Sequence, residues 1–280
     1  MSSGLKPHKG ITYPIRMEPV TIYTNLFTIQ GRNAKDNQYI SMFLIWFKML
    51  IKNGGLTARD SIVVLIDPPT AEALQEYDIL AHLIDTAGFH FNAIIVEQPV
   101  SLTAGIAKRY TVYDFLPLNQ LVCHLDVDVL CVKPIRQIIQ DSLQGSDIAI
   151  YLEGNSMGSY YLYELKDEIG ITEDDMKKTA GITGAIYFFR MSPSLIAHFK
   201  KLYTRIMTAT KQNITDQPYW NELFWNLRKS QYPISEIPDS VVETSLGNLQ
   251  ESTHLLNLCG EPGDGDFHWQ KVLTALLFLV

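Results

Sequence analysis

Two aspartates in the middle of the chain, Asp126 and Asp128, have the type and spacing that most clearly indicate chemistry. They lie in LVCHLDVDVLCVKPI, residues 121–135, which is otherwise mostly apolar. The β-branched residues around them favour extended chain, in which positions i and i+2 face the same side. We therefore expect both carboxylates to leave the end of a buried strand pointing together. Two like charges in an apolar segment need a neutralising partner. The pair thus predicts a divalent cation that also binds phosphate oxygens, although a D-x-D that merely begins a solvated loop is the simpler alternative.

The composition narrows the class of protein. The chain has 280 residues, a net charge of −7 and 46% hydrophobic residues, which is enough for a sizeable core. The acidic balance argues against nucleic-acid binding. The three cysteines lie in apolar runs without metal-ligand spacing and are expected to be reduced. With no signal-peptide core and no apolar run long enough to span a bilayer, the sequence predicts a cytoplasmic protein without a transmembrane segment.

The first half of the chain alternates between expected strands and helices. This alternation predicts an α/β fold with a mixed, mostly parallel central sheet flanked by helices. Ligands bind such sheets at the carboxyl ends of the strands, and the aspartate pair follows one of them. With no repeat or clean linker, one domain spanning 1–280 is the simpler organisation. Strands are expected at 19–26, 61–66, 91–96, 120–125, 147–152, 185–190 and 255–259. Helices are expected at 39–51, 105–116, 193–207 and 216–228, the last two capped by Ser192 and Thr215. A further helix is expected to begin after a cap at Thr70.

Four segments together resemble a known family. LDVDVLCVKPI, residues 125–135, resembles the segment around the metal-binding D-x-D of GT-A glycosyltransferases, most closely the glycosyltransferase family 8 and glycogenin-type pattern. TGAIYFFR, residues 183–190, resembles that family's N-A-G strand, and Asp216-Gln217 with Asn221 resembles its D-Q-x-x-x-N helix. LLNLCG, residues 255–260, resembles its closing H-F-x-G segment. The matches occur in the family's order and imply a nucleotide-sugar half, about 19–132, followed by an acceptor half, about 133–280.

The resemblance implies an activity and a set of site residues. It implies transfer of a sugar, with retention at the anomeric carbon, from a nucleoside diphosphate sugar to a glycan, protein or small-molecule acceptor. A UDP-hexose is the donor most frequent in the family. The cofactor would be Mn²⁺ or Mg²⁺, which stabilises the departing diphosphate as a Lewis acid. By the same resemblance, Asp126 and Asp128 would hold the metal, Arg109 with adjacent Lys108 would contact the diphosphate, Thr183 and Gly184 would contact the donor sugar, and Asp216 and Gln217 would lie at its reacting face.

The chain departs from the family pattern at two places. The family's late histidine, which completes the metal shell, falls on Asn257. An asparagine oxygen ligates hard cations, though more weakly than a carboxylate, and His254 and His268 are nearby substitutes. The family's N-A-G reads Thr183-Gly184-Ala185 here, which affects the predicted sugar contacts.

Other functions remain open at this stage. Phosphatases of the haloacid dehalogenase type also place a D-x-D after an apolar strand, which would make Asp126 a nucleophile, and GDGD at residues 263–266 mimics their late acidic motif. Their first motif opens the domain, however, whereas about four α/β elements precede Asp126 here. A non-catalytic GT-A-like binding protein is a third interpretation, because the late histidine is missing. Asp216 also has a purely structural explanation, since the helix dipole favours an acid in a first turn.

Overall fold

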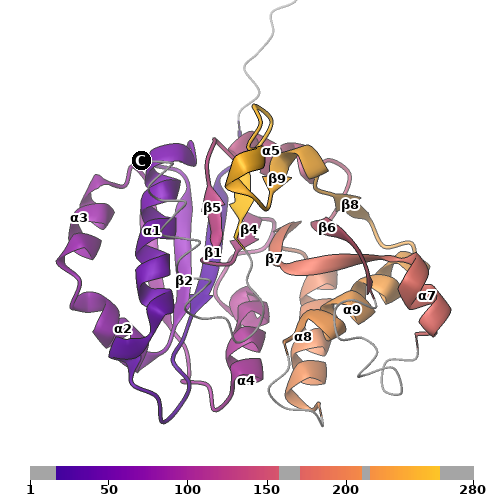
Figure 1. The fold of residues 1–280 in the computed structure, drawn as a ribbon, viewed down its shortest axis with the longest axis horizontal. Coiled ribbons are helices and arrows are strands. Elements are labelled where there is room, and N and C mark those ends of the chain that lie inside the picture. The colour runs from indigo at the N-terminus through magenta and orange to yellow at the C-terminus, as the bar shows by residue number, and fades with distance from the viewer. Residues whose placement is uncertain (1–16, 158–170, 210–214, 259–280) are drawn as a thin grey trace, which may run out of the picture.

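The fold is built on a seven-stranded sheet. The computed structural model describes residues 17–157, 171–209 and 215–258 (Figure 1). The strand order is β3-β2-β1-β4-β7-β6-β8. Four neighbouring pairs are parallel, and β7 runs antiparallel to both β4 and β6. This is the mixed, mostly parallel sheet that the sequence predicts. The strands are β1 (Val20–Leu26), β2 (Ser61–Ile66), β3 (His90–Ile95), β4 (Leu121–Leu125), β6 (Ile148–Ser156), β7 (Ala180–Arg190) and β8 (Ile234–Glu236).

Alternating side chains give this sheet two buried faces. On β4, Cys123 and Leu125 belong to one apolar cluster and Val122 to another. On β7, Phe188 and Phe189 divide in the same way, as the two-residue period of a strand requires. Helix α1 (Gln38–Asn53) packs into the first cluster, whereas α8 (Pro193–Met207) and α9 (Gln217–Lys229) pack into the second. Helices therefore cover both faces, as expected when both are apolar.

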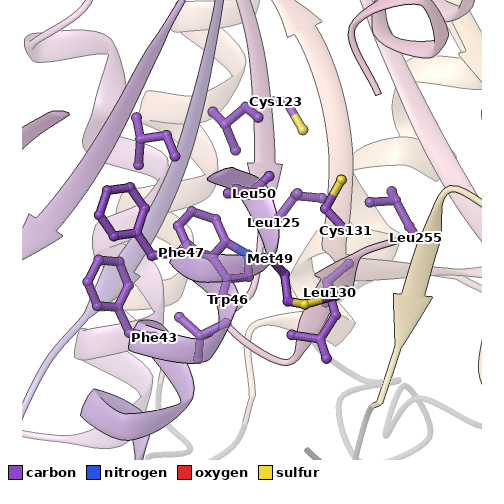
Figure 2. Packing of buried hydrophobic residues seen from close by; sticks show 14 of the residues in the cluster. Phe43, Trp46, Phe47, Met49, Leu50, Cys123, Leu125, Leu130, Cys131 and Leu255 are labelled. Atoms are coloured by element: carbon purple, nitrogen blue, oxygen red, sulfur yellow. The ribbon is translucent and has the colours of Figure 1, made fainter. Parts of the chain in front are cut away.

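Helix α1 is the main support of the first face. Nine of its 16 residues are buried, consistent with a helix that is apolar on most sides. Figure 2 shows its aromatic side chains beside Cys123 and Leu125 of β4. The rings of Phe43 and Phe47 stack with centroids 5.8 Å apart. Asn37 caps the helix by accepting a hydrogen bond from the Tyr39 amide. This packing fixes β4, and with it the position at which the aspartate pair begins.

A second, smaller sheet lies beyond the end of β4. It contains β5 (Val129–Cys131), β10 (Leu255–Asn257) and β9 (Val242–Glu243), in that order. Strand β10 pairs antiparallel with β5 and parallel with β9. The late segment of the chain is thereby placed directly beside the residues that follow the aspartate pair.

The remaining helices are short. They are α2 (Pro68–Gln75), α3 (Asp78–Thr86), α4 (Leu102–Ala107), α5 (Arg136–Ser142) and α7 (Glu173–Lys178), with 3₁₀ turns η1 (Ala34–Asp36), η2 (Lys108–Asp114), η5 (Asp239–Val241) and η6 (Leu246–Asn248). Among the described residues, no helix has the length and apolar character needed to cross a membrane.

Several local predictions were wrong. The helix expected at 105–116 is an α-helical turn that ends at Ala107 and continues as 3₁₀ helix η2. Asp67, not Thr70, caps α2, because its carboxylate accepts from the Thr70 amide at 3.3 Å. Thr215 does not cap α9, since Asp216 occupies the position before that helix and no side chain caps it. The predicted Ser192 cap of α8 is confirmed. His268 and the acidic run at 263–266 lie outside the described residues.

Candidate functional site

The aspartate pair lies in a tight turn between β4 and β5. The Asp126 amide donates to the Ala185 carbonyl of β7 at 3.0 Å, which continues the β4–β7 ladder by one residue. The Val129 amide then donates back to the Asp126 carbonyl at 3.0 Å, closing a four-residue turn. The expectation that extended chain aligns the two carboxylates was therefore wrong. Both side chains are half-buried, and the turn places them at the carboxyl end of β4.

Arg109 connects this turn to the second half of the chain. It lies in η2 and its side chain is only 6% exposed. Its Nη1 donates to the Gly184 carbonyl at 2.7 Å and to Asp126 Oδ1 at 3.2 Å. On its other side, Nε lies 3.3 Å from Asp216 Oδ2. Burial opposes the positive charge, but Asp126 and Asp216 raise the pKa of Arg109 well above its ordinary value. The guanidinium is a buried cation that bridges two carboxylates.

His124 holds one oxygen of Asp126. Its ring is fully buried between Tyr23 and Tyr187, with centroids 4.7 Å from each. Its Nε2 lies 2.9 Å from Asp126 Oδ1. Burial lowers the pKa of His124, which favours the neutral ring, and Nε2 also lies 3.2 Å from Arg109 Nη1. Among the described residues, Nδ1 has no hydrogen-bond partner.

The pKa of Asp126 reflects these contacts. Burial alone would raise it, but the charge of Arg109 and the hydrogen bond from His124 lower it to about 2. Asp126 is therefore ionised at every physiological pH. Because His124 and the shorter Arg109 contact both meet Oδ1, with Arg109 3.4 Å from Oδ2, the second oxygen is the one more weakly held. Asp126 can present that oxygen to a ligand.

Asp216 is anchored from two directions and does not cap its own helix. Besides Arg109, it accepts a hydrogen bond from the Tyr110 hydroxyl. The residue is only 2% exposed. Helix α9 is docked on β7 by Asn221, whose amide exchanges hydrogen bonds with the Ile182 backbone at 2.9 and 3.0 Å. The purely structural explanation of Asp216, a favourable position at a helix start, does not account for these contacts.

The other predicted residues lie around this centre. Gly184 accepts from Arg109, and a Cβ there would meet Arg109 Nη1 at 3.6 Å and an Asp216 oxygen at 3.7 Å. Thr183 is next to it, with its carbonyl accepting from the Trp220 indole at 3.0 Å. Gln217 follows Asp216 and is half-buried. Lys108, adjacent to Arg109, pairs instead with Glu97 at the surface.

Asn257 is brought to the aspartate turn by strand pairing. It lies opposite Val129, and the next amide, of Leu258, donates to the Asp128 carbonyl at 3.0 Å. Asn257 is fully buried, yet neither its Oδ1 nor its Nδ2 has a hydrogen-bond partner among the described residues. An unsatisfied buried polar group costs roughly 1–3 kcal/mol, so such a group calls for an explanation.

His254 is placed differently. Its Nδ1 lies 2.6 Å from the Pro134 carbonyl, and its own carbonyl accepts from the Val132 amide. It therefore lies at the end of the β5–β10 pair away from Asp128, whereas Asn257 lies at the near end. Of the two late residues considered for a metal shell, the strand register favours Asn257.

The charges of the site fit a cation. The turn carries the carboxylates of Asp126 and Asp128, and the guanidinium of Arg109 is shared between Asp126 and Asp216. In the described part of the chain, no group of three or more His, Cys, Asp and Glu side chains is arranged to hold a metal ion. A cation here would therefore draw on carboxylates and the Asn257 amide, an all-oxygen set of the kind that hard cations accept. The residues present fit such an ion.

Sequence reasoning missed two residues of this cluster, His124 and Tyr110. His124 lies two positions before Asp126, so strand alternation alone would have placed both on one face. Tyr110 is adjacent to Arg109, but a tyrosine in an apolar stretch carries no signal of its own.

Comparison with known proteins establishes the fold. No family model matches the sequence, and no curated protein matches it. Among solved structures, the apo form of WbbM, a bifunctional glycosyltransferase, is similar with a TM-score of 0.58 and 14% identity over 93% of this chain. The galactosyltransferase LgtC, in complex with donor and acceptor sugar analogs, gives 0.56 and 11% over 92%. The glycosyltransferase GlyE of Streptococcus pneumoniae TIGR4 gives 0.55 and 13% over 94%.

The lengths of these proteins differ. The chain spans 50% of the WbbM chain and 62% of GlyE, but 95% of LgtC. Together with the strand order and flanking helices, these similarities show that the chain has the GT-A fold that the sequence predicts.

Proposed function

We propose that the chain is a metal-dependent glycosyltransferase of the family 8 type, acting on a nucleoside diphosphate sugar, with a UDP-hexose as the expected donor. The observation that carries the proposal is the buried bridge Asp126–Arg109–Asp216. It joins the aspartate turn to the start of α9 at the carboxyl end of β4, where α/β sheets bind ligands. The GT-A fold of the chain supports the same conclusion.

Asp126 and Asp128 are the residues that would hold Mn²⁺ or Mg²⁺, with Asn257 beside them. The bound ion supplies Lewis-acid stabilisation of the diphosphate leaving group. The excess of carboxylates over cationic side chains at the site is what such an ion would neutralise. Asp126 would hold the ion through Oδ2, because Oδ1 is held by His124 and Arg109.

Arg109 acts as a positioning residue in this proposal. The sequence indicated a direct diphosphate contact, but the side chain is 6% exposed and its N–H groups are directed at Gly184, Asp126 and Asp216. It keeps the two carboxylates at a fixed separation. A preorganised charge of this kind needs no rearrangement during reaction.

Asp216 and Gln217 would lie at the reacting face of the sugar. Asp216 is deeply buried and already accepts from Tyr110 and Arg109, so we assign it to orienting the donor sugar and to stabilising positive charge at the sugar carbon. Gln217, which is half-buried, is the more accessible of the two. Thr183 and Gly184 would contact the donor sugar from β7. Retention at the anomeric carbon is part of the proposal.

The phosphatase alternative has less support. Phosphatases of this type open their domain with the nucleophilic aspartate, whereas strands β1, β2 and β3 precede the strand that carries Asp126 here. A binding protein without catalytic activity differs from the proposal only in turnover, so an activity assay separates them.

The test measures release of nucleoside diphosphate from a panel of UDP-, GDP- and CDP-sugars in the presence of MnCl₂. We expect hydrolysis of one donor, abolished by EDTA and by Asp216→Asn, and an initial sugar product with the anomeric configuration of the donor by NMR. Turnover of p-nitrophenyl phosphate that depends on Asp126, with none of any nucleotide sugar, would establish the phosphatase instead. Absence of both activities would favour a binding protein.

A further inference from the structure

Asn257 combines complete burial with an unsatisfied amide. Neither Oδ1 nor Nδ2 has a hydrogen-bond partner among the described residues, and the side chain is 0% exposed. Most buried polar groups in folded proteins are paired, so an exception calls for a ligand or another specific cause. Its position is equally specific, since β10 places it opposite Val129, the residue directly after Asp128.

Replacing this side chain by histidine would change the chemistry of the site. Carboxylate and carbonyl oxygens suit both Mg²⁺ and Mn²⁺, whereas an imidazole nitrogen favours transition metals, so Mn²⁺ accepts it more readily than the harder Mg²⁺ does. Asp126, Asp128 and Asn257 offer oxygens alone. With at most three such ligands, one of them neutral, a six-coordinate cation would keep several positions for water or phosphate oxygens.

The contacts of Asp126 further lower the affinity of this site for a cation in the absence of a nucleotide. Asp126 is already paired with Arg109 and hydrogen-bonded by His124. A carboxylate whose charge is matched by a buried guanidinium attracts a second cation less strongly. The diphosphate brings additional negative charge, so it would strengthen cation binding at this site.

We propose that Asn257 is an amide ligand that makes this an all-oxygen site, which binds its cation together with a nucleoside diphosphate and accepts Mg²⁺ nearly as well as Mn²⁺. The inference rests on the proposed function, because it assumes a nucleotide at the same site. Asn257 Oδ1 is the group for the cation, and Nδ2 is left to donate to a phosphate oxygen. This assignment satisfies both atoms of the buried amide.

The test uses isothermal titration of UDP, GDP and CDP into the full chain with MgCl₂, MnCl₂ or EDTA, together with titration of each metal alone. For the wild type we expect one nucleotide to bind, with affinities in MgCl₂ and in MnCl₂ that differ by no more than about tenfold. Each metal alone should bind with an affinity at least about tenfold lower than in the presence of that nucleotide. In N257H the preference for Mn²⁺ over Mg²⁺ should rise by about tenfold or more.

A third variant separates a ligand from a structural residue. N257L has the same branching without polar atoms, so it should reduce metal-dependent nucleotide affinity by about tenfold while leaving the metal-free melting temperature unchanged or higher, because a buried unsatisfied amide is removed. The role of Asn257 alone would be overturned if the wild type binds one nucleotide with metal, N257H keeps the original metal preference and N257L binds as tightly as the wild type. A wild type that binds no nucleotide with either metal would overturn the proposed function itself.

Discussion

Arg109→Met should destabilise the chain far more than an ordinary loss of an ion pair. The substitution keeps an unbranched side chain like the aliphatic part of arginine but leaves Asp126 and Asp216 without their shared counter-ion. Breaking a buried ion pair by removing one partner costs roughly 3–5 kcal/mol, since the remaining charge is buried and uncompensated. For a chain of this size, 1 kcal/mol corresponds to about 2–4 °C in melting temperature, so the melting temperature should fall by about 10 °C.

A matched control is available at the surface. Arg190 pairs with Glu18, and the two side chains are 33% and 54% exposed. Exposed pairs contribute roughly 0.2–1 kcal/mol, so Arg190→Met should lower the melting temperature by no more than about 4 °C. The double variant R109M/D216N removes one of the uncompensated charges and should recover part of the loss. Equal melting temperatures for R109M and R190M, or a double variant no more stable than R109M, would refute the buried-bridge account.

Two further predictions concern Asp126. Its pKa of about 2, against an ordinary 3.8, means that its contribution to stability is present above about pH 4 and is lost as the pH falls toward 2. The pKa difference corresponds to about 2.4 kcal/mol of stability. This is an upper limit, because the carboxylate is 31% exposed and solvent screens its charge. Chemical denaturation at pH 7 and pH 3 should show a smaller acid destabilisation in D126N than in wild type, and an identical one would contradict the assignment. At His124, the variant H124F keeps an aromatic ring between Tyr23 and Tyr187 but loses the hydrogen bond to Asp126 Oδ1, so metal-dependent nucleotide affinity should fall about tenfold. H124Q retains a donor and should restore binding to within about threefold of wild type, and equal affinity of both variants would argue against a positioning role.

The elements that follow from hydrophobic pattern were predictable. Strand β2 and helix α8 have the bounds that were expected, because a continuous aliphatic run and a capped amphipathic repeat are local signals. The order of four loose motifs also predicted the GT-A fold. The cap of α2 was assigned wrongly, since Asp67 and Thr70 are both good caps and only tertiary packing decides between them.

The sequence indicated most of the residues that form the candidate site, but not how their side chains are arranged. Asp126 and Asp128 stood out because charge interrupts an apolar run. That they occupy a turn depends on a backbone hydrogen bond between Val129 and Asp126, which sequence does not display. The bridging position of Arg109 could not be predicted for the same reason, because its two carboxylate partners come from segments 17 and 107 residues away along the chain. Long-range pairing of this kind leaves no local pattern.

The measurement that tests the central claim most directly is thermal unfolding with UDP, GDP and CDP, each with MnCl₂ and with EDTA. A ligand that binds only the native state raises the melting temperature by mass action, by an amount that grows with its concentration relative to Kd. The account predicts a shift with one nucleotide, lost in EDTA and lost in D128N, whose metal-free melting temperature should stay close to that of the wild type. No shift with any nucleotide, or a shift that persists both in EDTA and in D128N, would contradict a metal-dependent nucleotide site at the aspartate turn.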